Sequence, residues 1–103
     1  MATKVTNKEA IFSLIKSNRF RIREYGVNTL GLFGSFTNNK QNEKSDVDLL
    51  VDFETEKETY RNFINLAYFM EDLLGRKVEI VTRNGLSPYI GPHILKQVEY
   101  VSL

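Results

Sequence analysis

Several kinds of chemistry are excluded by what the sequence lacks. It contains no cysteine, which excludes disulfide bonds, thiol catalysis and thiolate zinc sites and fits a reducing compartment. No apolar run approaches the roughly 20 residues of a membrane-spanning helix. The N-terminal segment MATKVTNKEA also lacks the apolar stretch of a signal peptide. We therefore expect a cytoplasmic protein with no membrane partner.

A strong charge of either sign is missing as well. The 14 basic and 13 acidic residues give a net charge of +1, so sustained binding to nucleic acid is not expected. A length of 103 residues allows one hydrophobic core but no second substrate-binding lobe. We predict a single domain over residues 1–103, with residues 1–6 as a flexible tail. A large acceptor must then come from another protein.

Hydrophobic periodicity alternates between the helical and the extended type along the chain. It predicts helices over residues 7–16, 58–74 and 88–97 and strands over residues 27–35, 46–53 and 77–82. Gly75 is expected to end the second helix in a left-handed conformation. The predicted fold class is α/β (α+β).

Two surfaces leave alternatives open. Arg19, Arg21 and Arg23 could bind RNA or phosphate, but a solvated helix or strand face is the more common reason for such a pattern. The 58–74 helix carries a second apolar stripe that includes Phe69 and Leu73. This stripe could belong to the core or mediate a homodimer or hetero-oligomer.

Asp46 and Asp48 open the second predicted strand and point to the same face, with Cα atoms ~6.5 Å apart. Two such carboxylates can converge on a pair of hard cations that activate an attacking oxygen and hold phosphates. Alternatively, Asp46 caps the strand and Asp48 is merely exposed. A pair of this spacing is weak evidence by itself.

Gly34 and Ser35 follow the first predicted strand. A glycine lets backbone amides approach a phosphate and serine adds a hydroxyl donor, so the turn could form an anion nest. A plain turn is the alternative. The combination is more informative: an apolar strand, Gly-Ser, ten residues and then Asp-x-Asp opening an alternating strand.

Glu79 is an acid within a strand of valine and isoleucine, where a buried unpaired carboxylate would be costly. If this strand lies beside the second one, Glu79 can approach Asp46 and Asp48. It could then bridge a cation and accept the proton of an incoming hydroxyl. On an edge strand it could instead simply face water.

The segments LFGSF and SDVDLLVDF, with ten residues between Ser35 and Asp46, resemble the GSx10DxD signature of the minimal nucleotidyltransferases. These belong to the DNA polymerase beta-like superfamily, and the similarity extends over about residues 9–101. The resemblance implies a short mixed sheet with helices packed against it. It also implies ATP and two Mg²⁺ ions, with transfer of AMP and release of pyrophosphate.

The resemblance further implies roles for individual residues. Gly34 and Ser35 would hold the triphosphate, and Asp46 and Asp48 would bind both metal ions. Glu79 would take the place of the third carboxylate, which is more often aspartate in the family.

The loop between these motifs departs from the family pattern. Its members commonly have an Ala-Arg-Gly-Glu-like run where this chain has Thr37–Lys40. Lys40 and Ser45 are expected to bind the nucleotide, although an ammonium lacks the bidentate fork of an arginine.

Members of the family are often encoded beside a HEPN ribonuclease toxin, and some add AMP to a tyrosine of that toxin. The resemblance therefore implies a HEPN-type partner and an antitoxin role. Two forms of this role stay open: an active adenylyltransferase, or a weakly active or inactive fold that acts by binding.

Overall fold

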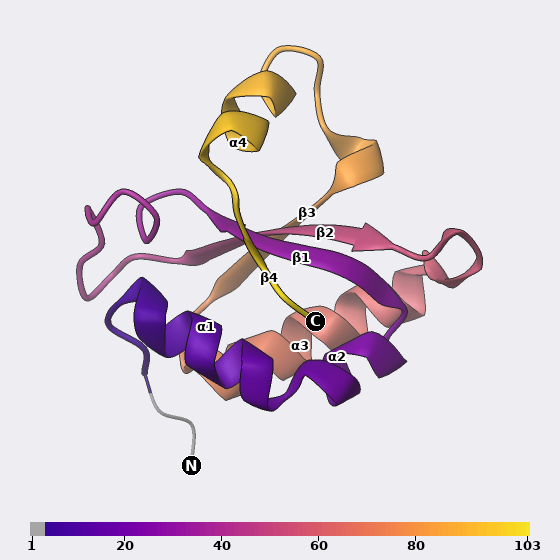
Figure 1. Ribbon diagram of the computed structural model, residues 1–103, viewed down its shortest axis with the longest axis horizontal. Helices are drawn as coiled ribbons and strands as arrows, with labels where there is room; N and C mark the ends of the chain where they lie inside the picture. The colour runs from indigo at the N-terminus through magenta and orange to yellow at the C-terminus, as the bar shows by residue number, and fades with distance from the viewer. Residues whose placement is uncertain (1–3) are drawn as a thin grey trace.

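The protein forms a four-stranded sheet with helices on both of its faces, seen in a computed structural model that describes residues 4–103 (Figure 1). The helices are α1 (Lys8–Ser17), α2 (Arg19–Glu24), α3 (Tyr60–Leu74) and α4 (Gly91–Gln97). The strands are β1 (Val27–Phe33), β2 (Val47–Phe53), β3 (Val78–Thr82) and β4 (Glu99–Val101), and the 3-10 turns are η1 (Thr55–Lys57) and η2 (Arg83–Gly85).

The sheet is mixed, with the strand order β3-β2-β1-β4. Strand β1 runs antiparallel to both β2 and β4, whereas β2 and β3 are parallel. A parallel pair needs a long crossover connection, and α3 supplies it. The fold class and the short mixed sheet expected from the sequence are confirmed.

The two faces of the sheet differ in how they are covered. Helices α1, α2 and α3 lie together on one face, and α4 stands over the other (Figure 1). The residues of β2 that point to the three helices are completely or almost completely buried, as the predicted alternation requires: Val47, Leu49, Val51 and Phe53. The acidic residues of β2 lie on the face of α4.

Helix ends agree with the sequence signals. Asn7 caps α1, and its side chain accepts a hydrogen bond from the amide of Ala10. Thr59 caps α3 in the same way, and Gly75 ends it with φ 67°. Each predicted boundary of these two helices lies within two residues of the observed one.

Within the predicted flexible tail, the structure holds Val5 in place. Val5 is 1% exposed, and its amide donates a hydrogen bond of 3.0 Å to the carbonyl of Leu74. Val5 is the one apolar residue among residues 4–6, and burial of its side chain beside the end of α3 holds this short segment against the helix. Residues 1–3 of the predicted tail lie outside the described residues.

Two short elements were not predicted. Helix α2 occupies the arginine-rich segment, where Ile22 is completely buried while the three arginines are exposed, as expected of a solvated face. Strand β4 pairs with β1, where Gly31 leaves room for the side chains of Val98 and Tyr100. Elements this short carry too little periodicity to be recognised in a sequence.

The second apolar stripe of α3 packs within the chain. The ring centroid of Phe69 lies 5.6 Å from that of Tyr25 and 5.2 Å from the guanidinium carbon of Arg21. Leu73 is partly buried against the core. Contacts within the chain therefore cover part of this apolar surface, and an oligomer through residues 58–74 stays a prediction.

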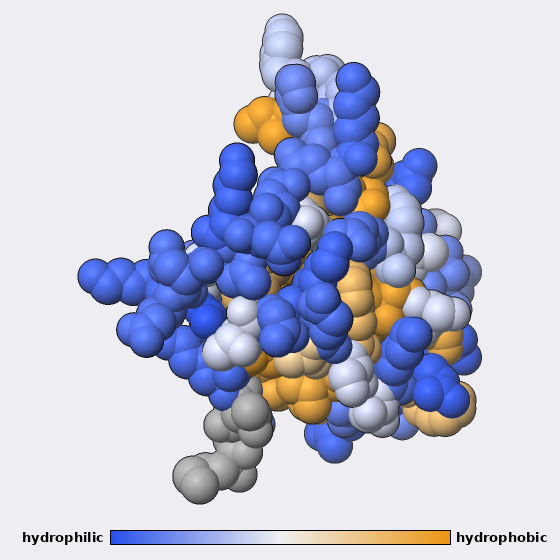
Figure 2. All heavy atoms as spheres, turned by 60° about the vertical axis from the view of Figure 1, so that its left-hand side comes forward, coloured by the Kyte–Doolittle hydropathy of each residue, from blue (hydrophilic) through white to orange (hydrophobic). Residues whose placement is uncertain are grey.

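Polar side chains cover most of the surface on the side of the loop that joins β1 and β2, with apolar residues grouped in smaller areas between them (Figure 2).

None of the helices within residues 4–103 has the length and the apolar composition needed to cross a membrane.

Candidate active site

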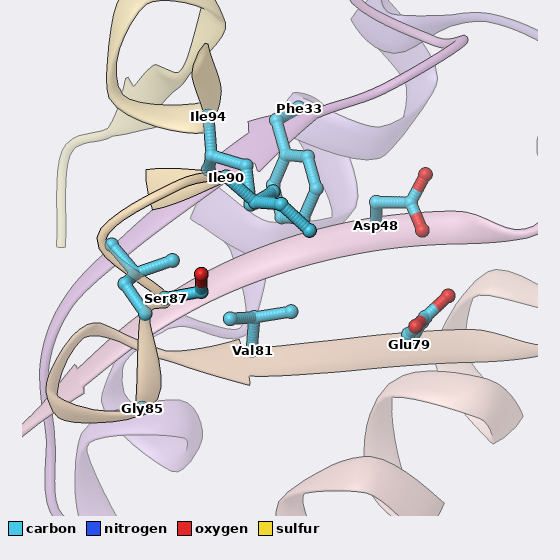
Figure 3. A pocket seen from close by; sticks show the side chains of 9 residues that line it. Phe33, Asp48, Glu79, Val81, Gly85, Ser87, Ile90 and Ile94 are labelled. Atoms are coloured by element: carbon cyan, nitrogen blue, oxygen red, sulfur yellow. The ribbon is translucent and has the colours of Figure 1, made fainter. Parts of the chain in front are cut away.

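Two carboxylates lie side by side in the parallel pair of strands. The register aligns Asp48 of β2 with Glu79 of β3. Both side chains project from the sheet at the same end of a cavity (Figure 3). Neighbouring strands are about 4.8 Å apart, so the two groups are close enough to share one cation.

The environment disfavours two negative charges at this place. The pKa of Asp48 is raised to about 6, first by burial and then by the negative charges of Glu79 and Asp46 and a hydrogen bond with Glu79. A proton can relieve the repulsion, and so can a cation. Two close, partly buried carboxylates of this kind are typical ligands of a divalent cation.

Asp46 is the more distant member of the predicted triad. It directly precedes β2 and is half-buried. Within residues 4–103, no three acidic or histidine side chains meet closely enough to enclose a metal ion. Mg²⁺ is typically held by one or two carboxylates together with substrate phosphates. Asp48 and Glu79 fit an ion of this kind that arrives with a triphosphate.

The Gly-Ser turn lies directly against Asp48. Gly34 has φ 83°, and a Cβ at this position would collide with the Asp48 carboxylate. The amide and the hydroxyl of Thr37 both donate to the carbonyl of Gly34, at 3.1 and 2.7 Å. In the described part of the chain, the amides of Ser35 and Phe36 donate to none of the backbone carbonyls in turns and loops. These two amides directly follow Gly34, the residue whose backbone lies against the Asp48 carboxylate.

Lys40 and Ser45 belong to the loop that follows. The amide of Lys40 donates to the carbonyl of Ser35 at 3.0 Å, and its side chain is exposed. The hydroxyl of Ser45 accepts a 2.8 Å hydrogen bond from the amide of Asn42, so it already serves the loop's own turn. Nucleotide binding by these two residues stays a prediction.

The cavity beside the carboxylates has a volume of about 360 Å³. Asp48 and Glu79 lie at one end, and Ile90 and Ile94 lie at the other (Figure 3). The remaining lining residues come from β1, β3 and the segment before α4: Phe33, Val81, Gly85, Leu86 and Ser87. Most of these residues were missed in the sequence, because no local pattern tells that the 85–94 segment folds back over the sheet.

A Gly-Ser turn next to paired carboxylates on a small mixed sheet is the arrangement expected of one class of enzyme, the nucleotidyltransferases. The chain belongs to the nucleotidyltransferase domain family, whose model matches residues 14–101. The predicted family and the predicted enzyme class are therefore confirmed.

Individual relatives agree with this assignment. The chain is 39% identical over 94 residues to the protein adenylyltransferase MntA of Thermococcus cleftensis. This match covers 90% of this chain and 94% of the relative. A solved structure provisionally described as a minimal nucleotidyltransferase is 28% identical, with a TM-score of 0.81 over 94% of this chain and 98% of the other.

A third similar protein was solved as a complex. It is described as a tri-AMPylated HEPN toxin of Shewanella oneidensis with its MNT antitoxin. The match has a TM-score of 0.62 and 17% identity, and it covers 86% of this chain and 70% of the other. At this identity the similarity establishes the fold alone.

Proposed function

We propose that this chain transfers AMP from ATP to a hydroxyl of a HEPN-type protein partner, with Mg²⁺ as cofactor, and acts as the antitoxin of that partner. The single observation that carries the proposal is the alignment of Asp48 with Glu79 at the acidic end of a cavity, against the Gly34 turn. Two findings support it further: a relative at 39% identity is named a protein adenylyltransferase, and a similar fold occurs with an AMPylated HEPN toxin.

The triphosphate would bind at the turn after β1. The amides of Ser35 and Phe36 and the hydroxyl of Ser35 are donors for phosphate oxygens, and the left-handed Gly34 keeps the backbone close to Asp48. Lys40 adds a mobile positive charge from the same turn. Asp46, Asp48 and Glu79 would hold two Mg²⁺ ions, which neutralise phosphate charge and polarise the reacting oxygen atoms.

The reaction is a displacement at the α-phosphorus of ATP. A bond forms between the acceptor oxygen and the α-phosphorus, and the bond from the α-phosphorus to the bridging oxygen of the leaving pyrophosphate breaks. The proton of the acceptor hydroxyl passes to the carboxylate of Glu79. Its exposed position on the edge strand β3 leaves it accessible to a hydroxyl of another protein.

The apolar end of the cavity would hold an uncharged part of the reacting molecules. Phe33, Val81 and Ile90 line it within one cavity shared with the two acids. A planar base or an aromatic acceptor side chain fits such a lining and displaces water from the reacting phosphate.

A second candidate function is inhibition of the partner by binding alone. The observation that favours it is the run Thr37–Lys40, which brings no arginine to the phosphate site. Tyr89 and Ile90 are 86% and 60% exposed close to the cavity, so they are free to contact a partner without any reaction.

One experiment separates the two functions. The chain is incubated with ATP labelled at the α-phosphate, Mg²⁺ and the protein encoded by the neighbouring gene, and transfer of label is followed together with ribonuclease activity. Label is expected with the wild type and with Asp52→Asn, which alters the same face of β2 outside the cavity. It should be lost with Asp48→Asn and Glu79→Gln.

Absence of transfer by the wild type to every tested neighbour would overturn the enzymatic proposal. Continued silencing of the ribonuclease by Asp48→Asn would establish binding as the mode of action.

A further inference from the structure

One charged side chain is buried away from the carboxylate pair. Arg76 is 8% exposed, and it is the single buried polar or charged residue within the described part of the chain. It lies between the Gly75 cap of α3 and β3. Burying a guanidinium requires several hydrogen bonds to its donors, so its partners show which parts of the fold depend on it.

The partners of Arg76 are backbone carbonyls. Its Nε donates to Val5 at 2.6 Å, and its Nη1 donates to Asn42, Glu43 and Ser45 at 3.0, 3.2 and 2.8 Å. Among residues 4–103, no carboxylate lies within ion-pair distance of it. The planar fork of arginine can serve several carbonyls at once, which a lysine cannot do.

The same guanidinium also contacts the other end of the loop. Its central carbon lies 5.0 Å from the centroid of the Phe36 ring, which is 1% exposed. Phe36 directly follows Ser35, and Ser45 directly precedes Asp46. One side chain therefore holds both ends of the loop that joins the phosphate turn to the acidic strand.

The loop has hydrogen bonds of its own, but few other contacts join it to the rest of the chain. Between Phe36 and Val47 it contains no apolar residue, and most of its side chains are exposed. The side chain of Gln41 donates to the carbonyl of Thr6 at 3.2 Å, which again ties the loop to the N-terminal segment. The position of Asp46 thus depends mainly on Arg76 and on the pairing of the Val47 amide with the carbonyl of Lys77 at 2.9 Å.

We propose that Arg76 is a positioning residue for the metal–triphosphate site. It touches no substrate, but it fixes the loop so that Asp46 and the Gly34–Ser35 turn face the Asp48–Glu79 pair. The inference rests on the proposed function, because it assigns Arg76 to the same site. Residues 4–6 belong to this arrangement, since the carbonyl of Val5 accepts from Nε.

The test measures binding of Mn²⁺ and ATP by the whole chain, which needs no acceptor. Mn²⁺ affinity in the presence of ATP is followed by electron paramagnetic resonance. Hydrogen exchange of residues 37–47 and the melting temperature are measured on the same samples. The variants are Arg76→Met, Arg76→Lys and a deletion of residues 1–6. Ile15→Val, in the core on the opposite face of the sheet, is the control for a general loss of stability.

Arg76→Met is expected to weaken Mn²⁺ binding by about 10- to 100-fold, the usual effect of removing a group that orients metal ligands. Exchange in residues 37–47 should accelerate. Arg76→Lys and the deletion should show smaller losses of the same kind, because each leaves some of the contacts to the loop. Ile15→Val should lower the melting temperature and leave Mn²⁺ affinity unchanged.

Wild-type affinity in folded Arg76→Met overturns the inference, and so does an equal loss in Ile15→Val. If Arg76→Met does not fold, unchanged affinity in both Arg76→Lys and the deletion overturns it instead. A wild type that binds no Mn²⁺ with ATP contradicts the proposed function. Hydrogen exchange of residues 37–47 in Arg76→Met then decides whether Arg76 holds the loop: faster exchange supports this, and wild-type exchange overturns it.

Discussion

The two faces of the sheet are built in different ways. The face under α1, α2 and α3 is a continuous apolar layer in which alternate residues of one strand share the same buried environment. The face under α4 combines two acids, a glycine turn and several apolar side chains from four separate segments. The first face supplies most of the buried apolar core, and the second gathers the residues of the candidate active site, where Asp48 and Glu79 repel each other. Substitutions should therefore separate the two properties.

The largest effect is expected on the face of α4. Asp48→Asn should reduce AMP transfer by about 1000-fold, because a neutral amide cannot bind the cation that stabilises the reacting phosphate. Transfer of labelled AMP to the partner measures the loss. Unchanged circular dichroism would show that the helical face is intact, and substantial remaining transfer would mean that another residue carries the chemistry.

The reverse result is expected on the helix-covered face. Leu49→Ala removes a completely buried side chain from the centre of β2 and should lower the free energy of unfolding by about 3 kcal/mol. Urea denaturation measures it. In the fraction that remains folded, the transfer rate should stay near that of the wild type. A selective loss of activity would mean that the two faces are coupled.

A substitution at the contact between turn and strand should affect both properties. Gly34→Ala places a Cβ against the Asp48 carboxylate in a left-handed backbone conformation. We expect a loss of about 2 kcal/mol of stability and weaker ATP binding. Gly26→Ala is the control: Gly26 is also left-handed, with φ 88°, and a Cβ there would collide with Lys57, but it does not line the cavity, so stability should fall while ATP binding stays unchanged.

The acidic pair should make the metal-free protein less stable as pH rises. The pKa of Asp48 is about 6 in the folded protein, against 3.8 ordinarily, so the folded state holds the extra proton between these values. Stability from this group is complete below pH ~4, falls as pH rises toward 6 and stays lower above that. Asp48→Asn should therefore raise the free energy of unfolding at pH 7.5 by about 1 kcal/mol after solvent screening, and the melting temperature by several degrees. At pH 4 the same substitution should change the melting temperature little.

Mg²⁺ and ATP provide the matching control for this prediction. They should raise the melting temperature of the wild type and leave that of Asp48→Asn nearly unchanged, because binding to the folded state alone is stabilising. A variant less stable than the wild type at pH 7.5 would contradict the repulsion that the structure indicates.

The smallest effect concerns the tie between α1 and β4. The Lys8 ammonium lies 3.1 Å from the Glu99 carboxylate, and both side chains are partly exposed. Lys8→Met should lower stability by only about 0.5 kcal/mol. Differential scanning fluorimetry at low and high salt measures it, and a large shift would mean that the short strand β4 depends on this ion pair.

Much of the architecture could be predicted because its signals are local. The alternation in β2 predicted that Asp48 lies on the face of the sheet away from the buried Val47 and Val51. An acid within a valine-rich strand indicated that Glu79 lies near the two aspartates, and it aligns with Asp48. The end of α3 at Gly75 is likewise indicated by a local signal, a glycine directly after the helix. In all these cases the decisive residues lie within a few positions of one another.

The rest depends on contacts between distant segments. Val5 is buried beside the end of α3, and Arg76 reaches the loop more than 30 residues earlier in the chain. Ile90 and Ile94 line the cavity only because the segment after η2 folds back over the sheet. No periodicity within these segments indicates the partner, so the apolar end of the cavity and the clamp on the loop could not be predicted.

The place of β3 at the open side of the sheet has a consequence for selectivity between transfer and hydrolysis. Glu79 faces solvent there, so a water molecule reaches it as readily as a hydroxyl of a second protein does. On this side of the proposed site, residues 4–103 form no wall that would keep water from the phosphorus. In the proposed reaction the acceptor itself closes the site, and ATP is protected from wasteful cleavage only while the two proteins are together.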